Sequence, residues 1–75
     1  MANATTTYPV MTMAEMERAF DQEWVLIVNP VIDPSTGDIG HGEVAVHSSD
    51  RDHVESQIDV VDPSRFAVYF MGKIP

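Results

Sequence analysis

The chain has 75 residues and no cysteine, and twelve Asp and Glu residues against four Lys and Arg give it a net charge of −8. This length predicts one domain with a small core, and the lack of cysteine excludes disulfides and thiolate metal sites as its stabilisers. So acidic a chain is repelled by phosphate backbones and anionic lipids, which argues against direct nucleic-acid or membrane binding.

The small size also bears on oligomeric state and location. A domain this short has a narrow stability margin, and without disulfides or metals it needs an economical core or a second subunit. We therefore expect a homo-oligomer or a protein partner. No apolar run reaches the roughly 18–20 residues that span a bilayer. Residues 1–7 carry neither a basic nor an apolar signal region, so the expected location is the cytoplasm.

The N-terminal region divides into an arm and the start of the domain. Residues 1–10 are small and polar and predict a flexible arm, and residues 11–75 predict a single α+β domain. Thr12 followed by Glu15 has the spacing of a capping box, in which each side chain bonds the other residue's backbone N–H. This pattern predicts a short helix over residues 13–20.

The apolar residues of this helix lie on one face. Met13, Met16 and Phe20 recur at i, i+3 and i+7, as on one side of a helix. Met11, just before the cap, and Met16 have the positions of a hydrophobic staple. Two turns of helix are not stable alone in water, so we expect this face to dock on the sheet.

Two strands joined by a long turn are predicted next. The first covers residues 23–29 and ends at Pro30, since proline interrupts a central strand. Residues 33–38 read Asp-Pro-Ser-Thr-Gly-Asp and have strong turn chemistry. The second strand covers residues 41–47. In it Val44 and Val46 alternate with polar residues and predict one apolar face and a place at the sheet edge.

A second helix and a last strand follow. Ser49 is the expected N-cap, with carboxylates in the first turn, and proline after Asp62 marks the helix end. The buried stripe of this helix, spaced i, i+4 and i+7, consists of Val54, Ile58 and Val61. The last strand covers residues 65–71 and stops at Gly72.

Together these elements predict an α+β fold with a three-stranded, mainly antiparallel sheet in the order 2-1-3. One helix crosses a face, and the short N-terminal helix adds to the coat. The runs 24–28 and 66–71 are apolar on both faces, and two small helices are expected to leave part of them uncovered. Such a patch marks an interface. The predicted partner-binding residues are Trp24, Val25, Ile27, Tyr69 and Met71.

Neither the histidines nor the turn at residues 33–38 predicts a metal or catalytic site. His41 and His47 share a strand face but lie roughly 20 Å apart at about 3.3 Å per residue. His47, Asp50 and His53 flank one junction, and only their convergence in a cleft would support an enzyme or metal site. The 33–38 turn lacks the alternating ligands and distal Glu of a calcium loop. We therefore expect no catalytic residue, no metal and no cofactor.

Four segments carry a resemblance to known sequences: Glu23-Trp24-Val25, Gly42-Glu43-Val44, residues 49–52 (Ser-Asp-Arg-Asp) and residues 69–75 (Tyr-Phe-Met-Gly-Lys-Ile-Pro). This pattern resembles a group of short uncharacterised bacterial proteins with a strand-strand-helix-strand plan. The resemblance covers about residues 12–75. It implies a fold and a bacterial source, but it implies no activity and no site residue.

The sequence therefore predicts a small non-catalytic protein–protein interaction module. We expect an accessory, regulatory or antitoxin-like protein that self-associates or binds a partner through an apolar sheet face or a strand edge. The alternative is an acidic mimic of nucleic acid that blocks a basic protein, and it requires the carboxylates to gather on one face.

Overall fold

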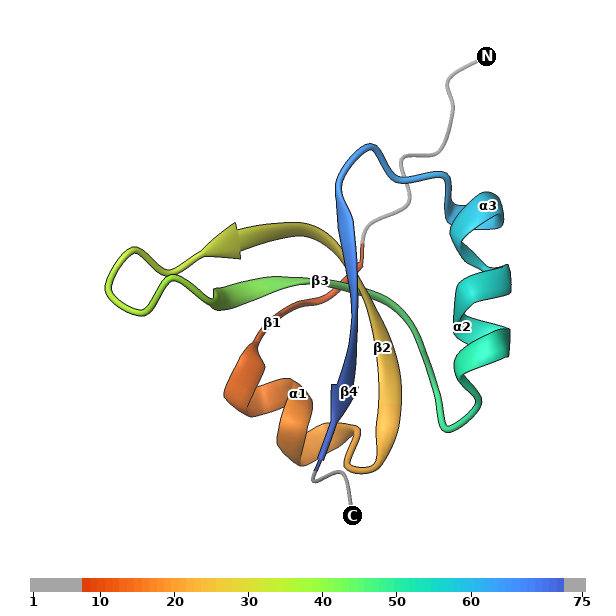
Figure 1. Ribbon diagram of the computed structural model, residues 1–75, viewed down its shortest axis with the longest axis horizontal. Helices are drawn as coiled ribbons and strands as arrows, with labels where there is room; N and C mark the ends of the chain where they lie inside the picture. The colour runs from red at the N-terminus through yellow and green to blue at the C-terminus, as the bar shows by residue number, and fades with distance from the viewer. Residues whose placement is uncertain (1–7, 73–75) are drawn as a thin grey trace.

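The computed structural model describes residues 8–72, which form an antiparallel sheet with helices on both faces (Figure 1). The sheet order is β1-β3-β2-β4. The strands are β1 (Val10–Thr12), β2 (Glu23–Ile32), β3 (Ile39–Ser48) and β4 (Phe66–Met71). The helices are α1 (Met13–Ala19) on one face of the sheet, and α2 (Arg51–Ser56) and α3 (Ile58–Val61) on the other.

The α+β class is confirmed, and β2 lies between β3 and β4 as predicted. The prediction of three strands is wrong, because β1 pairs with β3 and adds a fourth, so that β3 is not an edge over residues 41–43. Val10 faces Glu43, Met11 faces Gly42, and the Val44 N–H donates to the Pro9 carbonyl. A three-residue strand is too short to show a period of two, so sequence patterning could not reveal it.

Only the last three residues of the arm predicted over residues 1–10 are among the described residues. Its first part, residues 1–7, lies outside the described residues. Its last residue, Val10, belongs to β1 and is hydrogen-bonded into the sheet.

The capping box at the start of α1 is confirmed. The Thr12 N–H donates to Glu15 Oε1 at 2.8 Å, and the Glu15 N–H donates to Thr12 Oγ1 at 3.1 Å. The bond from the Thr12 backbone, followed by that with the Thr12 side chain, holds the pKa of the Glu15 carboxyl below its ordinary value. The cap therefore favours the ionised carboxylate.

This lowered pKa predicts a pH dependence of stability. A carboxyl whose folded-state pKa is depressed stabilises the fold above its unfolded pKa and loses that contribution as pH falls through the folded pKa. We expect Glu15→Gln, which keeps an acceptor but does not titrate, to lose less stability than the wild type between about pH 6 and pH 3. Urea unfolding at several pH values measures this, and Glu17→Gln on the same helix controls for the lost charge. Parallel pH profiles for the wild type and Glu15→Gln would contradict the assignment.

The β2–β3 hairpin is longer than predicted and projects from the body of the molecule (Figure 1). β2 does not end before Pro30 but continues to Ile32. The reason is an irregularity between Val28 and Val31, where the register with β3 shifts and Asn29 has a φ of 52°. Proline is tolerated at such a bulge because the ladder bond it cannot make is already absent.

A second bulge corrects the predicted faces of β3. Val46 pairs with Leu26 and Val44 pairs with Ile27, so Ala45 is an extra residue in β3. The bulge places Val44 and Val46 on opposite faces of the sheet, in different core clusters. The strict alternation assumed from the sequence holds only for an unbulged strand.

The second helical region is divided, and its N-cap differs from the prediction. α2 and α3 are separate at Gln57, and Asp50 rather than Ser49 is the cap, accepting from the Asp52 N–H at 3.0 Å. The Asp50 N–H in turn bonds Ser48 Oγ. The predicted stop before proline is confirmed: α3 ends at Asp62, which leaves the right-handed helical region with a φ of 51°.

Two core clusters lie on opposite faces of β2. The α1-side cluster consists of Met16, Val25, Ile27, Val44 and Met71, with Met11, Met13 and Phe20 packed against it. The α2-side cluster consists of Leu26, Val28 and Val54, with Trp24, Ala45, Val46, Ile58, Val61 and Val68 packed against it. The predicted helical stripe thus lies in the second cluster, and β2 is buried on both faces.

The α1-side cluster requires glycine at position 42. A Cβ added to Gly42 would overlap Cγ2 of Ile27, and Ile27 is fully buried. We expect Gly42→Ala to lower the free energy of unfolding by about 1–3 kcal/mol through overpacking. Gly40→Ala is the control, because its nearest neighbour, Asp33 Cβ, lies at 3.3 Å on the projecting hairpin. Chemical denaturation of both variants measures the difference, and equal stability would contradict the tight approach.

Candidate functional site

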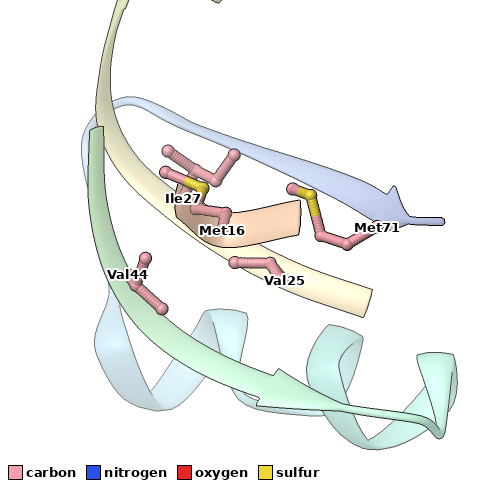
Figure 2. Close-up of a cluster of buried hydrophobic side chains, with 5 residues drawn as sticks. All are labelled: Met16, Val25, Ile27, Val44 and Met71. Carbon is pink, nitrogen blue, oxygen red and sulfur yellow. The ribbon is translucent and has the colours of Figure 1, made fainter. Parts of the chain in front are cut away.

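Three of the five predicted partner-binding residues lie inside the protein (Figure 2). Val25 and Ile27 are 0% exposed and Met71 is 1% exposed, and all three belong to the α1-side cluster. Figure 2 shows Met16 of α1 lying among them. In this fold they do not form a surface that a partner could contact.

The elements that cover this face of the sheet bury more of it than the sequence predicts. Met16 is fully buried, and Met13 and Phe20 of α1 pack beside it. The unforeseen strand β1 adds Met11 to the same cluster. Long, flexible methionine side chains fill irregular space, so two turns of helix and one short strand cover more of the sheet than their length suggests.

Trp24 lies on the other face, half-buried at the edge of the α2-side cluster. Its ring is 5.1 Å from that of Phe70, and the Arg51 guanidinium carbon lies 4.9 Å from the ring centroid. Arg51 Nε also bonds Glu55 Oε2 at 2.8 Å. Trp24 therefore joins α2 to β4, and its indole is already packed by the chain itself.

Tyr69 is the one predicted residue with substantial exposure, at 40%, and it lies on β4. Phe66, on the same strand and the opposite face, is 45% exposed. β4 pairs with β2 on one side, and among the described residues no strand pairs with its other side. β4 therefore carries both the exposed aromatic side chains and an edge whose backbone N–H and C=O groups pair with no other described strand.

The register shows which backbone groups are available at this edge. The Asn29 N–H donates to the Arg65 carbonyl and the Gln22 N–H donates to the Met71 carbonyl, so the odd-numbered residues of β4 face β2. In an antiparallel pair the alternate residues direct their N–H and C=O away from the partner. The outward groups of β4 are therefore those of Phe66, Val68 and Phe70. None of these three residues is among the partner-binding residues predicted from the sequence, although the predicted strand order places this strand at an edge.

The two ends of the β4 edge carry opposite charge. Arg65 precedes the strand, is exposed, and bonds the Pro30 carbonyl at 3.4 Å through Nη2. Beyond the other end, a surface hollow of about 500 Å³ is lined by Glu17, Asp21, Gln22 and Gly72. Asp21 Oδ1 lies 3.3 Å from where a Cβ on Gly72 would be, so this carboxylate is next to the end of the strand.

The histidine region does not form a catalytic or metal cluster in the described part of the chain. His47 stacks on Phe20 with ring centroids 4.2 Å apart, and its Nδ1 lies 2.8 Å from Glu23 Oε1. Asp50 is occupied as the cap of α2, and His53 is exposed. Within residues 8–72 no three His, Asp or Glu side chains gather closely enough to hold a metal ion.

The 33–38 turn is stabilised by its own side chains. Asp33 Oδ1 accepts from Ser35 Oγ at 2.7 Å and from the Ser35 N–H at 2.9 Å. The first of these bonds, then the second, lowers the pKa of the Asp33 carboxyl. Thr36 Oγ1 accepts from the Asp38 N–H, and Gly37 has a φ of 78°. These local hydrogen bonds therefore stabilise the turn at which the chain reverses direction between β2 and β3.

Comparisons of the chain with protein-family models, with curated proteins and with solved structures returned no match. The resemblance to short bacterial proteins stays a prediction. Among the described residues, the helices are all too short or too polar to cross a bilayer.

Proposed function

We propose that the protein is a small non-catalytic interaction module that binds a protein strand along the open edge of β4. The partner strand would extend the sheet by bonding the outward backbone groups of Phe66, Val68 and Phe70. Main-chain bonds supply affinity in this mode of recognition, and pockets for alternate side chains supply specificity. An accessory or regulatory role, as expected from the sequence, fits such a module.

One observation carries the proposal: the open edge is also where the exposed aromatic side chains, Phe66 and Tyr69, lie, whereas the other exposed large apolar residues are aliphatic and belong to β1, the hairpin and α3. Exposed edges are normally protected by charge, proline or a covering segment, because they pair readily with other chains. The described part of β4 has none of these within its six residues, Phe-Ala-Val-Tyr-Phe-Met. The opposite edge consists of β1, which is only three residues long and uses Thr12 as a helix cap, and of the end of β3 beyond it, which carries the bulge at Ala45.

The alternative, a mimic of nucleic acid, lacks the observation that it needs. Carboxylates lie on α1, at the hairpin turn and on α2 and α3, and these helices are on opposite faces of the sheet. Glu17 of α1 lies on one side of the sheet, and Asp59 of α3 lies on the other. Because the acidic groups are spread in this way, we do not adopt the mimic as a proposal.

Selection of extended peptides tests the proposed function. Random peptides displayed on phage would be panned against the full chain, and the selected peptides titrated into ¹⁵N-labelled protein. We expect the largest amide shifts and the greatest slowing of hydrogen exchange at Phe66, Val68 and Phe70. Binders that all map to the hairpin or to α1, leaving the amides of β4 unchanged, would overturn the proposal.

A further inference from the structure

The occupant of the β4 edge can be inferred from the strand itself. We propose that it is a second copy of this chain, bound so that the two β4 strands run antiparallel about a two-fold axis at Val68. This inference rests on the proposed function and names its partner. The two sheets would then form one continuous sheet, with the four described strands of each copy.

The register follows from the outward backbone groups. Only even-numbered residues of β4 direct N–H and C=O outward, so only they can form hydrogen-bonded pairs with the second copy. Placing Val68 opposite Val68 of the second copy also pairs Phe66 with Phe70 in both directions. This register uses all the outward groups and forms about six backbone hydrogen bonds. A shift by two residues in either direction leaves an outward residue of the strand without a partner in the facing strand.

The side chains fit the same register. On the α2 face, each Phe66 meets Phe70 of the second copy, which gives two cross-strand aromatic pairs. On the α1 face, each Tyr69 lies opposite the small Ala67 of the second copy. A large ring beside a small residue fills space without a clash, and the pattern repeats twice because of the symmetry.

Charge favours a second copy at this edge in spite of the net charge of −8. Residues 63–75 contain Arg65 and Lys73 and no carboxylate, so this is a locally basic segment of an acidic chain. Two copies that meet along β4 therefore bring no Asp or Glu of this segment together. Contacts between copies elsewhere on the surface would bring carboxylates together, and the repulsion between these like charges disfavours such contacts.

Arg65 also meets an acidic partner in this arrangement. It lies opposite Met71 of the second copy in a non-hydrogen-bonded pair, in which Cα atoms are about 4.5 Å apart and side chains are close. The next residue, Gly72, lines the hollow with Asp21 and with Glu17 of α1. Strand alternation gives Arg65 the same face as Met71, which belongs to the α1-side cluster. In the dimer, each exposed Arg65 guanidinium would exchange its 3.4 Å bond to the Pro30 carbonyl for the Asp21 carboxylate of the other copy, which lies beside Gly72.

Charge reversal tests the pairing. Sedimentation velocity of the full chain from about 1 to 500 µM covers the range of weak interfaces. We expect a monomer–dimer equilibrium in the wild type, and about tenfold weaker association in Arg65→Glu and in Asp21→Lys, because each places like charges together. The double variant, which has the wild-type net charge, should recover association to within about threefold. Asp38→Lys at the hairpin turn is the control for the changed net charge and should not weaken association.

Cross-linking tests the register. The chain has no cysteine, so Val68→Cys introduces a single thiol at the two-fold axis, where the Cα separation suits a disulfide. We expect Val68→Cys to form a disulfide dimer on mild oxidation and Tyr69→Cys, facing Ala67, to form much less. Dimers from Tyr69→Cys alone would overturn this register. Thermal unfolding of the reduced variants checks that both remain folded.

The outcomes separate this inference from the proposed function. A wild type that stays monomeric over the whole range, or a double variant that fails to recover association, overturns the second copy as occupant. If peptides selected on phage still perturb Phe66, Val68 and Phe70 in that case, the edge binds a different protein strand and the proposed function stands. If neither copy nor peptide engages β4, both proposals fail.

Discussion

Ile27→Ala is expected to lower the free energy of unfolding by about 2–5 kcal/mol, the range for removing a buried isoleucine side chain in a well-packed core. Ile27 is 0% exposed, packs in the cluster with Met16 and Val44, and lies against Gly42. Since small domains have total stabilities of only about 5 kcal/mol or a little more, this substitution should remove much of the folded population. Urea unfolding followed by the fluorescence of Trp24, the single tryptophan, gives the value.

Tyr69→Ala is the matched comparison, because Tyr69 was predicted from the sequence to have the same role as Ile27. It is 40% exposed on the β4 edge, so its truncation should lower stability by about 1 kcal/mol or less. Its effect should instead appear in self-association. The measurements belong at concentrations at which the wild type is monomeric, since association with the folded state adds apparent stability.

The two variants therefore separate a core role from an interface role. If Ile27→Ala loses little stability but no longer associates, then Ile27 is an interface residue. That result would contradict its burial under α1 and β1. A loss of stability in Tyr69→Ala as large as that in Ile27→Ala would show that Tyr69 is packed like a core residue. Tyr69 would then not count among the exposed side chains that β4 offers to a partner.

The parts of the fold that were predictable from the sequence are those with partners close in the chain. The Thr12–Glu15 capping box involves residues three positions apart, and both of its bonds are present. The end of α3 at Asp62, before proline, follows from local steric restriction. Such features need no knowledge of the rest of the chain.

The parts that were not predictable depend on pairing between distant segments. β1 exists because Val10–Thr12 meets residues 41–43, and three residues have no periodicity of their own. The sequence predicts that Pro30 ends β2, yet the strand continues because the register with β3 shifts around Asn29. The same applies to Ala45, whose bulge turns Val44 and Val46 to opposite faces.

The candidate site shows why composition alone misplaces an interface. The sequence shows which β2 and β4 residues are apolar, but not how much area α1 and β1 cover. Val25 and Met71 were expected at a surface and are buried, because Met11, Met13 and Phe20 close over them. The exposed aromatic residues Phe66 and Tyr69 lie on the last strand in the sheet order, which has one side without a partner among the described residues.

Ala67→Pro is expected to destabilise the protein by about 3 kcal/mol or more, whereas Phe66→Pro should leave it folded. Ala67 directs its N–H toward Ile27 of β2, and proline removes that donor from the ladder and clashes within the sheet. Phe66 is the first residue of β4, and its N–H points outward. Proline is tolerated at the first residue of a strand and at edges that face solvent. Circular dichroism with urea unfolding measures both variants at low concentration.

The same pair tests what the open edge does. Phe66→Ala removes the aromatic ring but keeps the N–H, so its difference from Phe66→Pro isolates the outward backbone donor. We expect both to stay folded, with Phe66→Pro weakening association more than Phe66→Ala, because proline removes a hydrogen bond in each of the two symmetric pairs. If Phe66→Pro unfolds the chain and Ala67→Pro does not, then the even-numbered residues face β2, and the edge offered to a partner is formed by the N–H and C=O groups of the odd-numbered residues instead.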